Sequence, residues 1–311
     1  MSLYITLTNE QLPSELHYMT YNVDQAMREE AFPETKWMAR KDRVAALINE
    51  VNADIITLQE MRKLPNTITV NEWLATSFPQ YYYEIGFRNA SALSFGQANL
   101  YNPNKFYADR TVKRWLSDTP NVISDTWASS AGGSTGFGYL VLATRFLWVF
   151  EGKVVENKKP FWVFNVHFGL EEDLKTKSCA KLLEIVKEVS GGESSIISGD
   201  FNLFPDRDAT KQRAILVSEF NDIGEGAITS QKAQKVEGTF VGFEHDSFKA
   251  DLKNMVSRLD HIFTYPKTNQ FVKRDPAQLI TKTMLVPEPE ELSVRHLPSD
   301  HLPISVKLTV V

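Results

Sequence analysis

The chain has 311 residues, of which 42% are apolar and 23% are charged. These proportions are typical of a globular protein with a substantial core, and they exclude a disordered or collagen-like chain. The single cysteine excludes an internal disulfide framework and a cysteine-based zinc site. The formal net charge of −5 counts against tight non-specific binding to nucleic acid, which depends on a basic face.

The N-terminal segment, residues 1–16, has neither the basic start nor the sustained apolar run of a signal peptide. The longest apolar run, residues 139–150, is too short to span a bilayer and contains Arg145, so we expect no transmembrane segment. These features favour a soluble protein of the cytoplasm, although a leader removed before this start would leave secretion open. We also expect a monomer.

In chain order, hydrophobic periodicity predicts two strand–helix–strand units and a terminal strand. The Gly/Ser-rich residues 131–138 and the polar residues 286–292 are predicted to be loops, and neither is long enough to separate two domains. We therefore expect a single domain over residues 1–311, with its core over about 15–311. The predicted elements are a strand over 15–23, a helix over 37–51, a strand over 54–60, a strand over 161–169, a helix over 172–189, a strand over 194–202 and a strand over 301–311.

The predicted strands share one feature, because each apolar run ends in Asn, Asp, Glu or His. A single polar residue at such a place is usually a turn or cap residue. Repetition at six places is better explained by a binding site, since strand ends are where α/β folds gather functional groups. The residues concerned are Asn22, Asp24, Glu60, Asn165, His167, Asp200, Asn202, Asp260, His261, Asp300 and His301.

The chemistry of this set points to phosphoester hydrolysis. Carboxylate and amide oxygens without cysteine suit Mg²⁺ or Mn²⁺ better than zinc. Asn and His donors can hold phosphate oxygens, and a nearby Asp can take a proton from water. The chain has no G-x-x-x-x-G-K-[ST] loop and no G-x-S-x-G elbow, which excludes P-loop nucleotide hydrolysis and argues against an α/β-hydrolase esterase.

Seven segments resemble the endonuclease/exonuclease/phosphatase superfamily in sequence and in order. The chain is most similar to the branch with a W-L-S-x-T-P segment, which is related to the CCR4-type deadenylases and to uncharacterised bacterial members. The resemblance spans Tyr21 to about Ile304, nearly the whole chain. The segments are TYNV (20–23), LQE (58–60), RWLSDTP (114–120), NVH (165–167), SGDFN (198–202), RLDHIF (258–263) and LPSDHLPI (297–304).

This resemblance implies a four-layer α/β sandwich of the DNase I-like type, with two mixed β-sheets packed face to face and helices outside. It also implies a Mg²⁺- or Mn²⁺-dependent phosphoester hydrolase in which an activated water attacks directly, with no covalent intermediate. The metal ligands are then Glu60 and Asp300, with Asn22 nearby.

The same resemblance assigns roles to the remaining residues of the set. Phosphate is bound by Asn165, His167, Asn202 and His301, and Asp200 activates or orients the water. Asp260 is expected to hydrogen-bond His301 and to fix its tautomer and charge. The catalytic residues are therefore Asp200, His301, His167, Asp260 and Asn202.

The substrate is left open at this point between a small or lipid phosphoester and a short single-stranded nucleic acid. Two departures from the family pattern weaken any analogy: Gln97 replaces a usual Glu, and Val241 replaces a His that we expect to face the substrate. The alternative is a catalytically silent protein of the same fold that binds a phosphorylated partner. Binding alone does not require Glu60, Asp200 and Asp300 together, so we favour the enzyme.

Several other residues are predicted to be structural. His17 is expected to be structural and Cys179 to be a small core residue, and Trp115 is expected to pack rather than to stack on a base. His261 should point away from Asp260, because neighbouring residues on a strand face opposite ways. For Arg145, a phosphate contact and a surface position are equally open.

Overall fold

The computed structural model describes most of the chain. The predicted loops at 131–138 and 286–292 lie outside the described residues, apart from Gly138. Among the described residues, no helix is both long and apolar enough to cross a bilayer. The described ranges are 3–25, 33–62, 68–91, 94–124, 126–127, 138–203, 209–226, 228–229, 238–242, 257–280 and 297–311.

The first of two mixed sheets is eight-stranded and is built mainly from the middle of the chain. Its strands β9 and β10 are parallel, whereas β13 runs antiparallel to β10. In spatial order the strands are β1 (Tyr4–Ile5), β8 (Lys153–Val155), β7 (Tyr139–Phe150), β9 (Phe161–His167), β10 (Ser195–Asp200), β13 (Asp260–Tyr265) and β11 (Asn221–Asp222), with β6 (Phe106–Leu116) paired to β7.

The second sheet is also eight-stranded and joins the two ends of the chain. Its parallel pair is β2 and β3, and the last strand, β16, runs antiparallel to β2. In spatial order the strands are β12 (Ile228–Thr229), β15 (Gln278–Leu279), β16 (Ile304–Val310), β2 (Glu15–Asn22), β3 (Ile55–Arg62), β5 (Phe95–Tyr101) and β4 (Tyr82–Phe87), with β14 (Phe271–Lys273) paired to β16.

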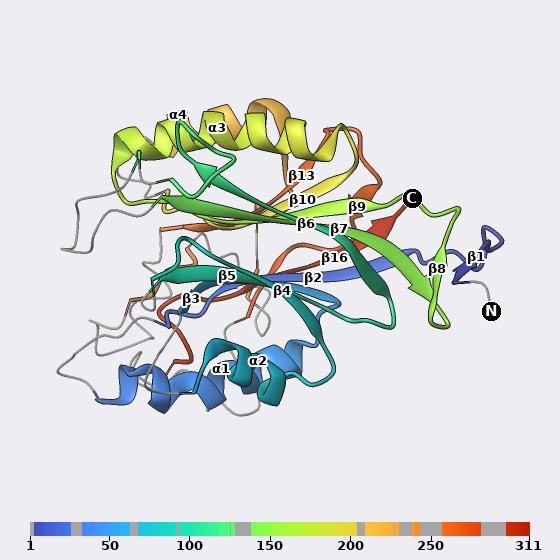
Figure 1. The fold of residues 1–311 in the computed structure, drawn as a ribbon, viewed down its shortest axis with the longest axis horizontal. Coiled ribbons are helices and arrows are strands. Elements are labelled where there is room, and N and C mark those ends of the chain that lie inside the picture. The colour runs from blue at the N-terminus through green and yellow to red at the C-terminus, as the bar shows by residue number, and fades with distance from the viewer. Residues whose placement is uncertain are drawn as a thin grey trace.

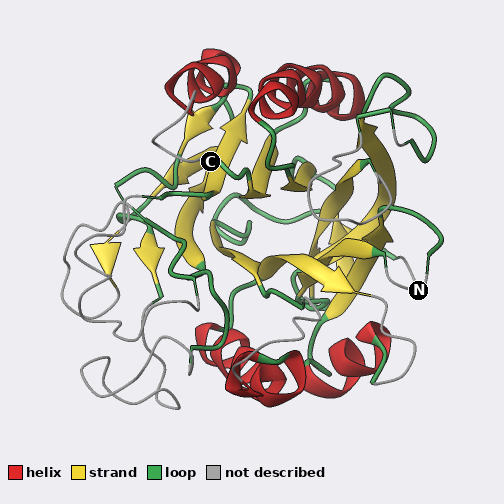
Figure 2. Ribbon diagram, turned by 90° about the vertical axis from the view of Figure 1, so that its left-hand side faces the viewer, coloured by secondary structure: helices red, strands yellow, loops and turns green. Residues whose placement is uncertain are grey.

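Helices cover the outer face of each sheet. The long α3 (Glu172–Ser190) and α4 (Ala209–Glu219) lie over the first sheet, and α1 (Trp37–Val51) and α2 (Val70–Ser77) lie under the second (Figure 1). The view turned by 90° shows the same four layers (Figure 2). The predicted four-layer sandwich is therefore confirmed.

Local sequence explains where these helices begin and end. The α2 helix begins at a capping box, in which the Thr69 hydroxyl accepts from the Glu72 N–H and Glu72 accepts from the Thr69 N–H. The α1 helix ends at Asn52 in the left-handed conformation, which Asn tolerates better than most residues. A short 3₁₀ helix, Pro33–Thr35, precedes α1.

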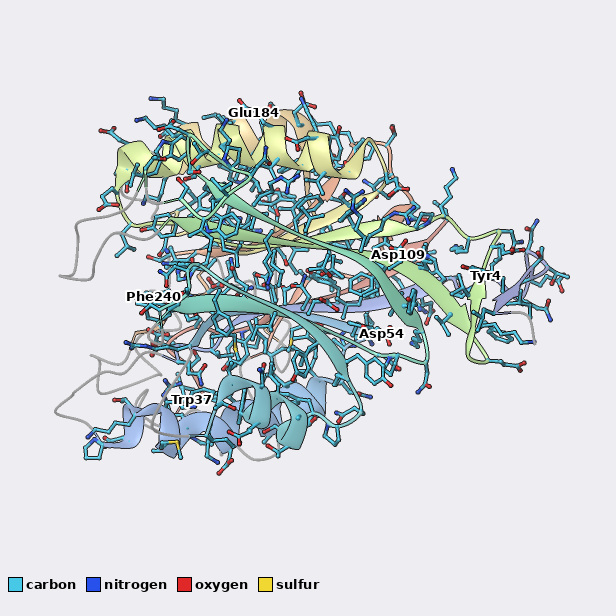
Figure 3. All side chains as sticks on the ribbon, viewed as in Figure 1. Tyr4, Trp37, Asp54, Asp109, Glu184 and Phe240 are labelled. Atoms are coloured by element: carbon cyan, nitrogen blue, oxygen red, sulfur yellow. The ribbon has the colours of Figure 1, made fainter. Side chains whose placement is uncertain are left out.

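Side chains of both sheets fill the space between them (Figure 3). One cluster combines Phe146 and Phe161 of the first sheet with Tyr18 and Tyr101 of the second, and the rings of Tyr101 and Phe146 are 5.1 Å apart. Neither sheet can bury this face alone, so each depends on the other for its core. The single domain stays a prediction from the sequence, and the shared core agrees with it.

The predicted elements correspond closely to the observed ones. The strands of both predicted units are β2, β3, β9 and β10, and their helices are α1 and α3, with boundaries that agree to within two residues. The sequence did not resolve α2 or α4, and it indicated strands between the two units without giving the bounds of β4 to β7. Several of these strands have mixed burial patterns, such as that of β6, so their alternation is weak.

Gly199, in β10, is the residue whose lack of a side chain the fold most requires. Its φ is +139°, and a Cβ added there would lie 1.9 Å from the Val166 carbonyl oxygen of β9. At Gly152, which also has a positive φ of +73°, a Cβ would meet nothing within 4 Å.

We expect Gly199→Ala to lower the free energy of unfolding by about 3 kcal/mol or more, because backbone strain and a backbone clash add together. Gly152→Ala, the matched control, should cost only about 1–2 kcal/mol from its left-handed backbone. Urea denaturation of both variants measures the difference. Equal losses would show that the close approach of β9 and β10 is not what requires glycine.

Candidate active site

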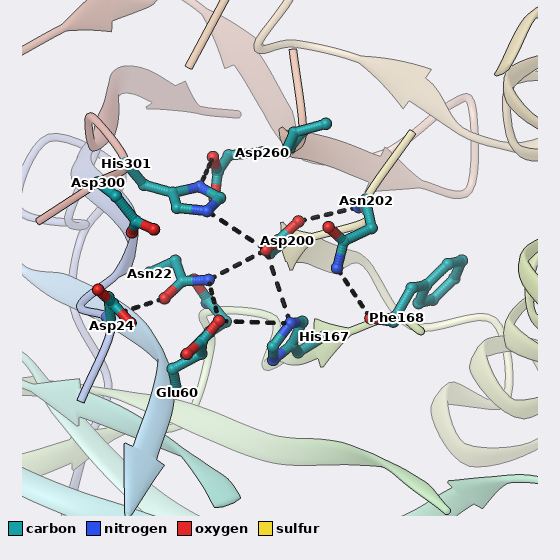
Figure 4. Close-up of polar contacts among 12 residues, drawn as sticks. Asn22, Asp24, Glu60, His167, Phe168, Asp200, Asn202, Asp260, Asp300 and His301 are labelled. Atoms are coloured by element: carbon teal, nitrogen blue, oxygen red, sulfur yellow. Dashed lines mark hydrogen bonds and ion pairs between the residues drawn. The ribbon is translucent and has the colours of Figure 1, made fainter. Parts of the chain in front are cut away.

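The polar strand ends predicted from the sequence lie together at one end of the sandwich. Asn22 ends β2, His167 ends β9, and Asp200 ends β10. Asp260 begins β13 directly opposite Asp200, because these strands are antiparallel. Phe240, which forms an isolated β-bridge to His301, is labelled in Figure 3 and shows where this end of the sandwich lies. Figure 4 shows the resulting cluster of side chains.

The Asn22 amide joins the two sheets at the centre of this cluster. Its Nδ2 donates to Glu60 Oε1 at 3.1 Å and to Asp200 Oδ2 at 3.0 Å. The Asp24 N–H donates to Asn22 Oδ1 at 3.0 Å, which fixes the orientation of the amide (Figure 4). Glu60 belongs to the second sheet and Asp200 to the first, so a single side chain holds carboxylates of both.

Glu60 reaches this position through a strained backbone. Its φ is +58°, and the pairing of β3 with β5 shifts register between Leu58 and Met61. A bulge of this kind re-aims a side chain at the cost of local strand pairing. A non-glycine residue in this conformation costs of the order of 1–3 kcal/mol, and such strain is typical of functional sites.

His301 is held by a carboxylate, as the family resemblance implied. Its Nδ1 lies 2.7 Å from Asp260 Oδ2, and its Nε2 faces Asp200 Oδ2 at 3.7 Å. The Phe240 ring packs edge-on against the imidazole, with 5.1 Å between centroids. Asp300 precedes it in a loop that Ser299 ties to β2, through a 2.7 Å hydrogen bond from Oγ to the Asn22 carbonyl.

Asn202 supports Asp200 from the opposite side. The Asn202 N–H donates to Asp200 Oδ1 at 2.8 Å, and its Nδ2 donates to the Phe168 carbonyl at 2.9 Å. The Asn202 backbone is left-handed, with φ of +51°, and its carbonyl accepts from Lys175 Nζ at 2.8 Å. The amide of Asn202 is thus used within the protein, while its position fixes the Asp200 carboxylate.

The protonation equilibria of the site differ from those of exposed groups. Burial raises the pKa of Asp200 to about 7, although nearby His301 opposes the rise. Burial also raises the pKa of Glu60, and the neighbouring Asp300 carboxylate raises it further. The environment therefore favours neutralising these carboxylates, by protons or by a bound cation.

The two histidines are shifted in opposite directions. Burial lowers the pKa of His167 well below its ordinary value, and the Arg88 guanidinium adds to this effect. Burial also acts to lower the pKa of His301, but the carboxylates of Asp260 and Asp200 outweigh it and raise the pKa well above its ordinary value.

A group of three side chains in the site could hold a metal ion. The ligand atoms of Glu60, His167 and Asp200 all lie within 4.8 Å of one another. His167 Nε2 is 3.8 Å from Glu60 Oε1 and 3.6 Å from Asp200 Oδ2. Among the described residues, no lysine or arginine forms an ion pair with Glu60. Two carboxylates beside one imidazole fit a divalent cation.

Asn165, predicted to contact phosphate, lies in the interior of the sandwich. It is fully buried between the sheets, where Nδ2 donates to the carbonyls of Leu58 and Ala98 and to Asn99 Oδ1. Its Oδ1 accepts from Gln59 Nε2 at 2.9 Å. Asn165 therefore bonds to the backbones of β3 and β5 beside the β3 bulge, within the polar layer between the sheets.

Sequence reasoning missed three basic residues around the site. Arg88 Nη2 donates to His167 Nδ1 at 3.1 Å. The buried Arg40 guanidinium donates to the carbonyls of Val23, Asp24 and Pro298, which links the loops after β2 and before β16. Lys175 had a signal, because it lies at helical spacing with the buried Ser178, Cys179 and Leu182 of α3. Nothing in the local sequence marks Arg88.

Most residues expected to be structural are so. His17 pairs with Ser305 Oγ at 2.6 Å, and Cys179 is fully buried. His261 packs in parallel on the Phe263 ring, on the face opposite to the His301 partner Asp260. Both departures from the family pattern are also internal: Gln97 donates to the Leu140 carbonyl at 2.8 Å, and Val241 lies in the core between the sheets.

Two expectations are decided by the contacts of single side chains. Trp115 is nearly buried, and its indole N–H donates to the Arg88 carbonyl at 2.9 Å. Arg145 pairs with Glu193 and Asp109, each at 2.7 Å, so the surface position holds rather than a phosphate contact.

Comparison with known proteins identifies the family. A family model described as the endonuclease/exonuclease/phosphatase family matches residues 19–301. An uncharacterised protein of Acanthamoeba polyphaga mimivirus is 31% identical over 230 residues, which cover 73% of this chain and 80% of that protein.

Two solved structures from Bacteroides thetaiotaomicron, each 24% identical to this chain, have the same fold. An endonuclease/exonuclease/phosphatase family protein aligns with a TM-score of 0.73 over 96% of this chain and 99% of that one. A mannosyl-6-phosphatase aligns with a TM-score of 0.70 over 94% and 99%. The resemblance seen in the motifs is confirmed: the chain belongs to the endonuclease/exonuclease/phosphatase family.

Proposed function

We propose that the protein is a divalent-metal-dependent phosphoester hydrolase in which water attacks phosphorus directly. The observation that carries this proposal is the convergence on the Asp200 carboxylate. Its Oδ2 accepts from Asn22 Nδ2 at 3.0 Å and faces the Nε2 atoms of His167 and His301 at 3.6 and 3.7 Å. Hydrolysis by an activated water needs a base next to the groups that bind phosphate, and Asp200 lies between the two histidines that would do so.

We propose that Mg²⁺ or Mn²⁺ is held by Glu60 and Asp300. Asn22, which donates to Glu60 and Asp200, lies beside them. The support is the oxygen donor set and the neighbouring Asp300 carboxylate, which adds to the effect of burial in raising the pKa of Glu60. A bound cation would neutralise charge on the phosphate and lower the barrier to attack.

The residues of the chain supply the proton transfers and the orientation. Asp200 accepts a proton from the attacking water while the water oxygen forms a bond to phosphorus. The bond from phosphorus to the leaving oxygen breaks, and the leaving oxygen keeps the electron pair of that bond. His301, held by Asp260 Oδ2 at 2.7 Å, donates a hydrogen bond to the phosphate. His167 donates a second one, and Asn202 keeps Asp200 in position through its N–H.

The substrate class that we propose is a small phosphoester. The net charge of −5 disfavours a long polyanion, and one structural neighbour is named a mannosyl-6-phosphatase. A lipid phosphoester and a short single-stranded nucleic acid are the alternatives. Hydrolysis of sugar phosphates, sphingomyelin, and single-stranded DNA and RNA, with added Mg²⁺ or Mn²⁺, discriminates among the three.

Metal dependence can be measured apart from substrate choice. We expect Mn²⁺ to bind in a calorimetric titration, and Glu60→Gln to weaken that binding at least tenfold, because the charged ligand is lost. Hydrolysis should stop in EDTA and return with Mg²⁺ or Mn²⁺. Glu184→Gln, on the exposed outer side of α3, is the matched control and should bind as the wild type does. Full activity in EDTA, with no bound metal detected, would contradict the proposal.

Asp200→Asn should reduce kcat by several orders of magnitude, because the amide keeps the shape of the carboxylate but cannot accept the proton. The fold should be unchanged by circular dichroism and thermal denaturation. A variant that turns over substrate at nearly the wild-type rate would remove Asp200 from the mechanism.

Asp260 and His301 should behave as one unit. Either Asp260→Asn or His301→Ala should lower kcat strongly, and the double variant should be little worse than His301→Ala alone, because residues acting together are not additive. The control pair is Asp222→Asn with His301→Ala, whose losses should add, since Asp222 pairs with Arg258 whereas His301 pairs with Asp260. Fully additive losses for Asp260 and His301 would refute their coupling.

A further inference from the structure

The two histidines that face Asp200 have partners of opposite charge. Behind His301, the Nδ1 atom meets the Asp260 carboxylate at 2.7 Å. Behind His167, the Nδ1 atom meets the Arg88 guanidinium at 3.1 Å. The rings present the same Nε2 edge to Asp200, at 3.7 and 3.6 Å. Their chemical difference therefore originates in the residue behind each ring.

The direction of the Arg88 hydrogen bond follows from its donor. A guanidinium has five N–H donors and no acceptor, and it stays protonated in proteins. His167 Nδ1 must then be the acceptor, so it carries no proton. In the neutral ring the proton lies on Nε2, which faces Glu60 and Asp200.

We propose that Arg88 is a positioning residue that holds His167 as the Nε2–H tautomer, so that His167 donates a hydrogen bond to phosphate and ligates no metal. The inference rests on the proposed function in naming phosphate as the acceptor. It also decides between two interpretations of the Glu60–His167–Asp200 group. A protonated Nε2 has no lone pair for a cation, which leaves the carboxylates as ligands.

Arg88 is itself held in place by its neighbours. Its N–H donates to the Phe95 carbonyl at 2.8 Å, and its carbonyl accepts from the Trp115 indole at 2.9 Å. Its guanidinium lies over the Tyr139 ring, 4.5 Å from the centroid. The negative face of the ring attracts the cation and so helps to hold the guanidinium in place. Trp115 comes from the W-L-S-x-T-P segment, so this segment acts on the site through Arg88.

The proton on His167 can be observed directly by long-range ¹H–¹⁵N correlation spectra of protein labelled at histidine, with and without Mg²⁺. His167→Gln identifies the resonances by their loss. In the wild type at pH 7.5 we expect an unprotonated Nδ1 and a protonated Nε2 in His167. A protonated Nδ1 would overturn the proposal. Because this measurement is made on the wild-type protein, it does not depend on how well a variant folds.

Arg88→Met tests the cause. Without the guanidinium, the carboxylates near Nε2 are unopposed, and we expect the Nδ1 resonance of His167 to move toward that of a protonated nitrogen. The matched control is Arg110→Met, which removes an arginine lying 5.7 Å over the Trp162 ring and should leave the spectrum unchanged. A spectrum of Arg88→Met identical to that of the wild type would refute the role of Arg88.

Metal binding gives a second readout that does not need turnover. Mn²⁺ should bind His167→Gln with a dissociation constant within threefold of the wild type, whereas a loss of tenfold or more would make His167 a ligand. If no phosphoester is hydrolysed although the His167 tautomer and Mn²⁺ binding are as expected, the proposed function is refuted. The positioning role of Arg88 would still stand.

Discussion

The site depends on one amide group, because Asn22 Nδ2 donates at once to Glu60 in one sheet and to Asp200 in the other. The amide is fixed by the Asp24 N–H, and the Asn22 carbonyl accepts from Ser299 Oγ. Two carboxylates are thus held close together, with no ion pair from lysine or arginine to Glu60 among the described residues. Such proximity is costly in a buried site unless protons or a cation compensate it.

A buried polar seam sets the relative position of the two sheets near this amide. Tyr18 and Thr57 of the second sheet meet Ser198 Oγ of the first at 2.6 and 2.8 Å, and Asn165 crosses to the β3 backbone. Buried polar groups are costly unless they are paired, so this seam permits few relative placements of the sheets. Apolar packing alone would tolerate small shifts, which would separate Asn22 from Asp200.

The strand ends could be predicted from the sequence because apolar runs ending in Asn, Asp or His are a local pattern, and the family motifs supplied their partners. The Asp260–His301 contact was predicted in this way. The buried bonds of Asn165 were not predicted, because Asn165 and His167 share a face of β9 and their sequence spacing does not distinguish their surroundings. Arg88 was missed because its partner lies 79 residues away and no nearby residue type marks it.

The most direct test of the account is a crystal structure with Mn²⁺ and inorganic phosphate, in which anomalous scattering locates the metal. We expect one manganese peak within coordination distance of the Glu60 and Asp300 carboxylates. The phosphate should lie with its oxygens toward the Nε2 atoms of His167 and His301, on the side of Asp200. Manganese ligated by His167, or phosphate bound away from Asp200, would contradict the account.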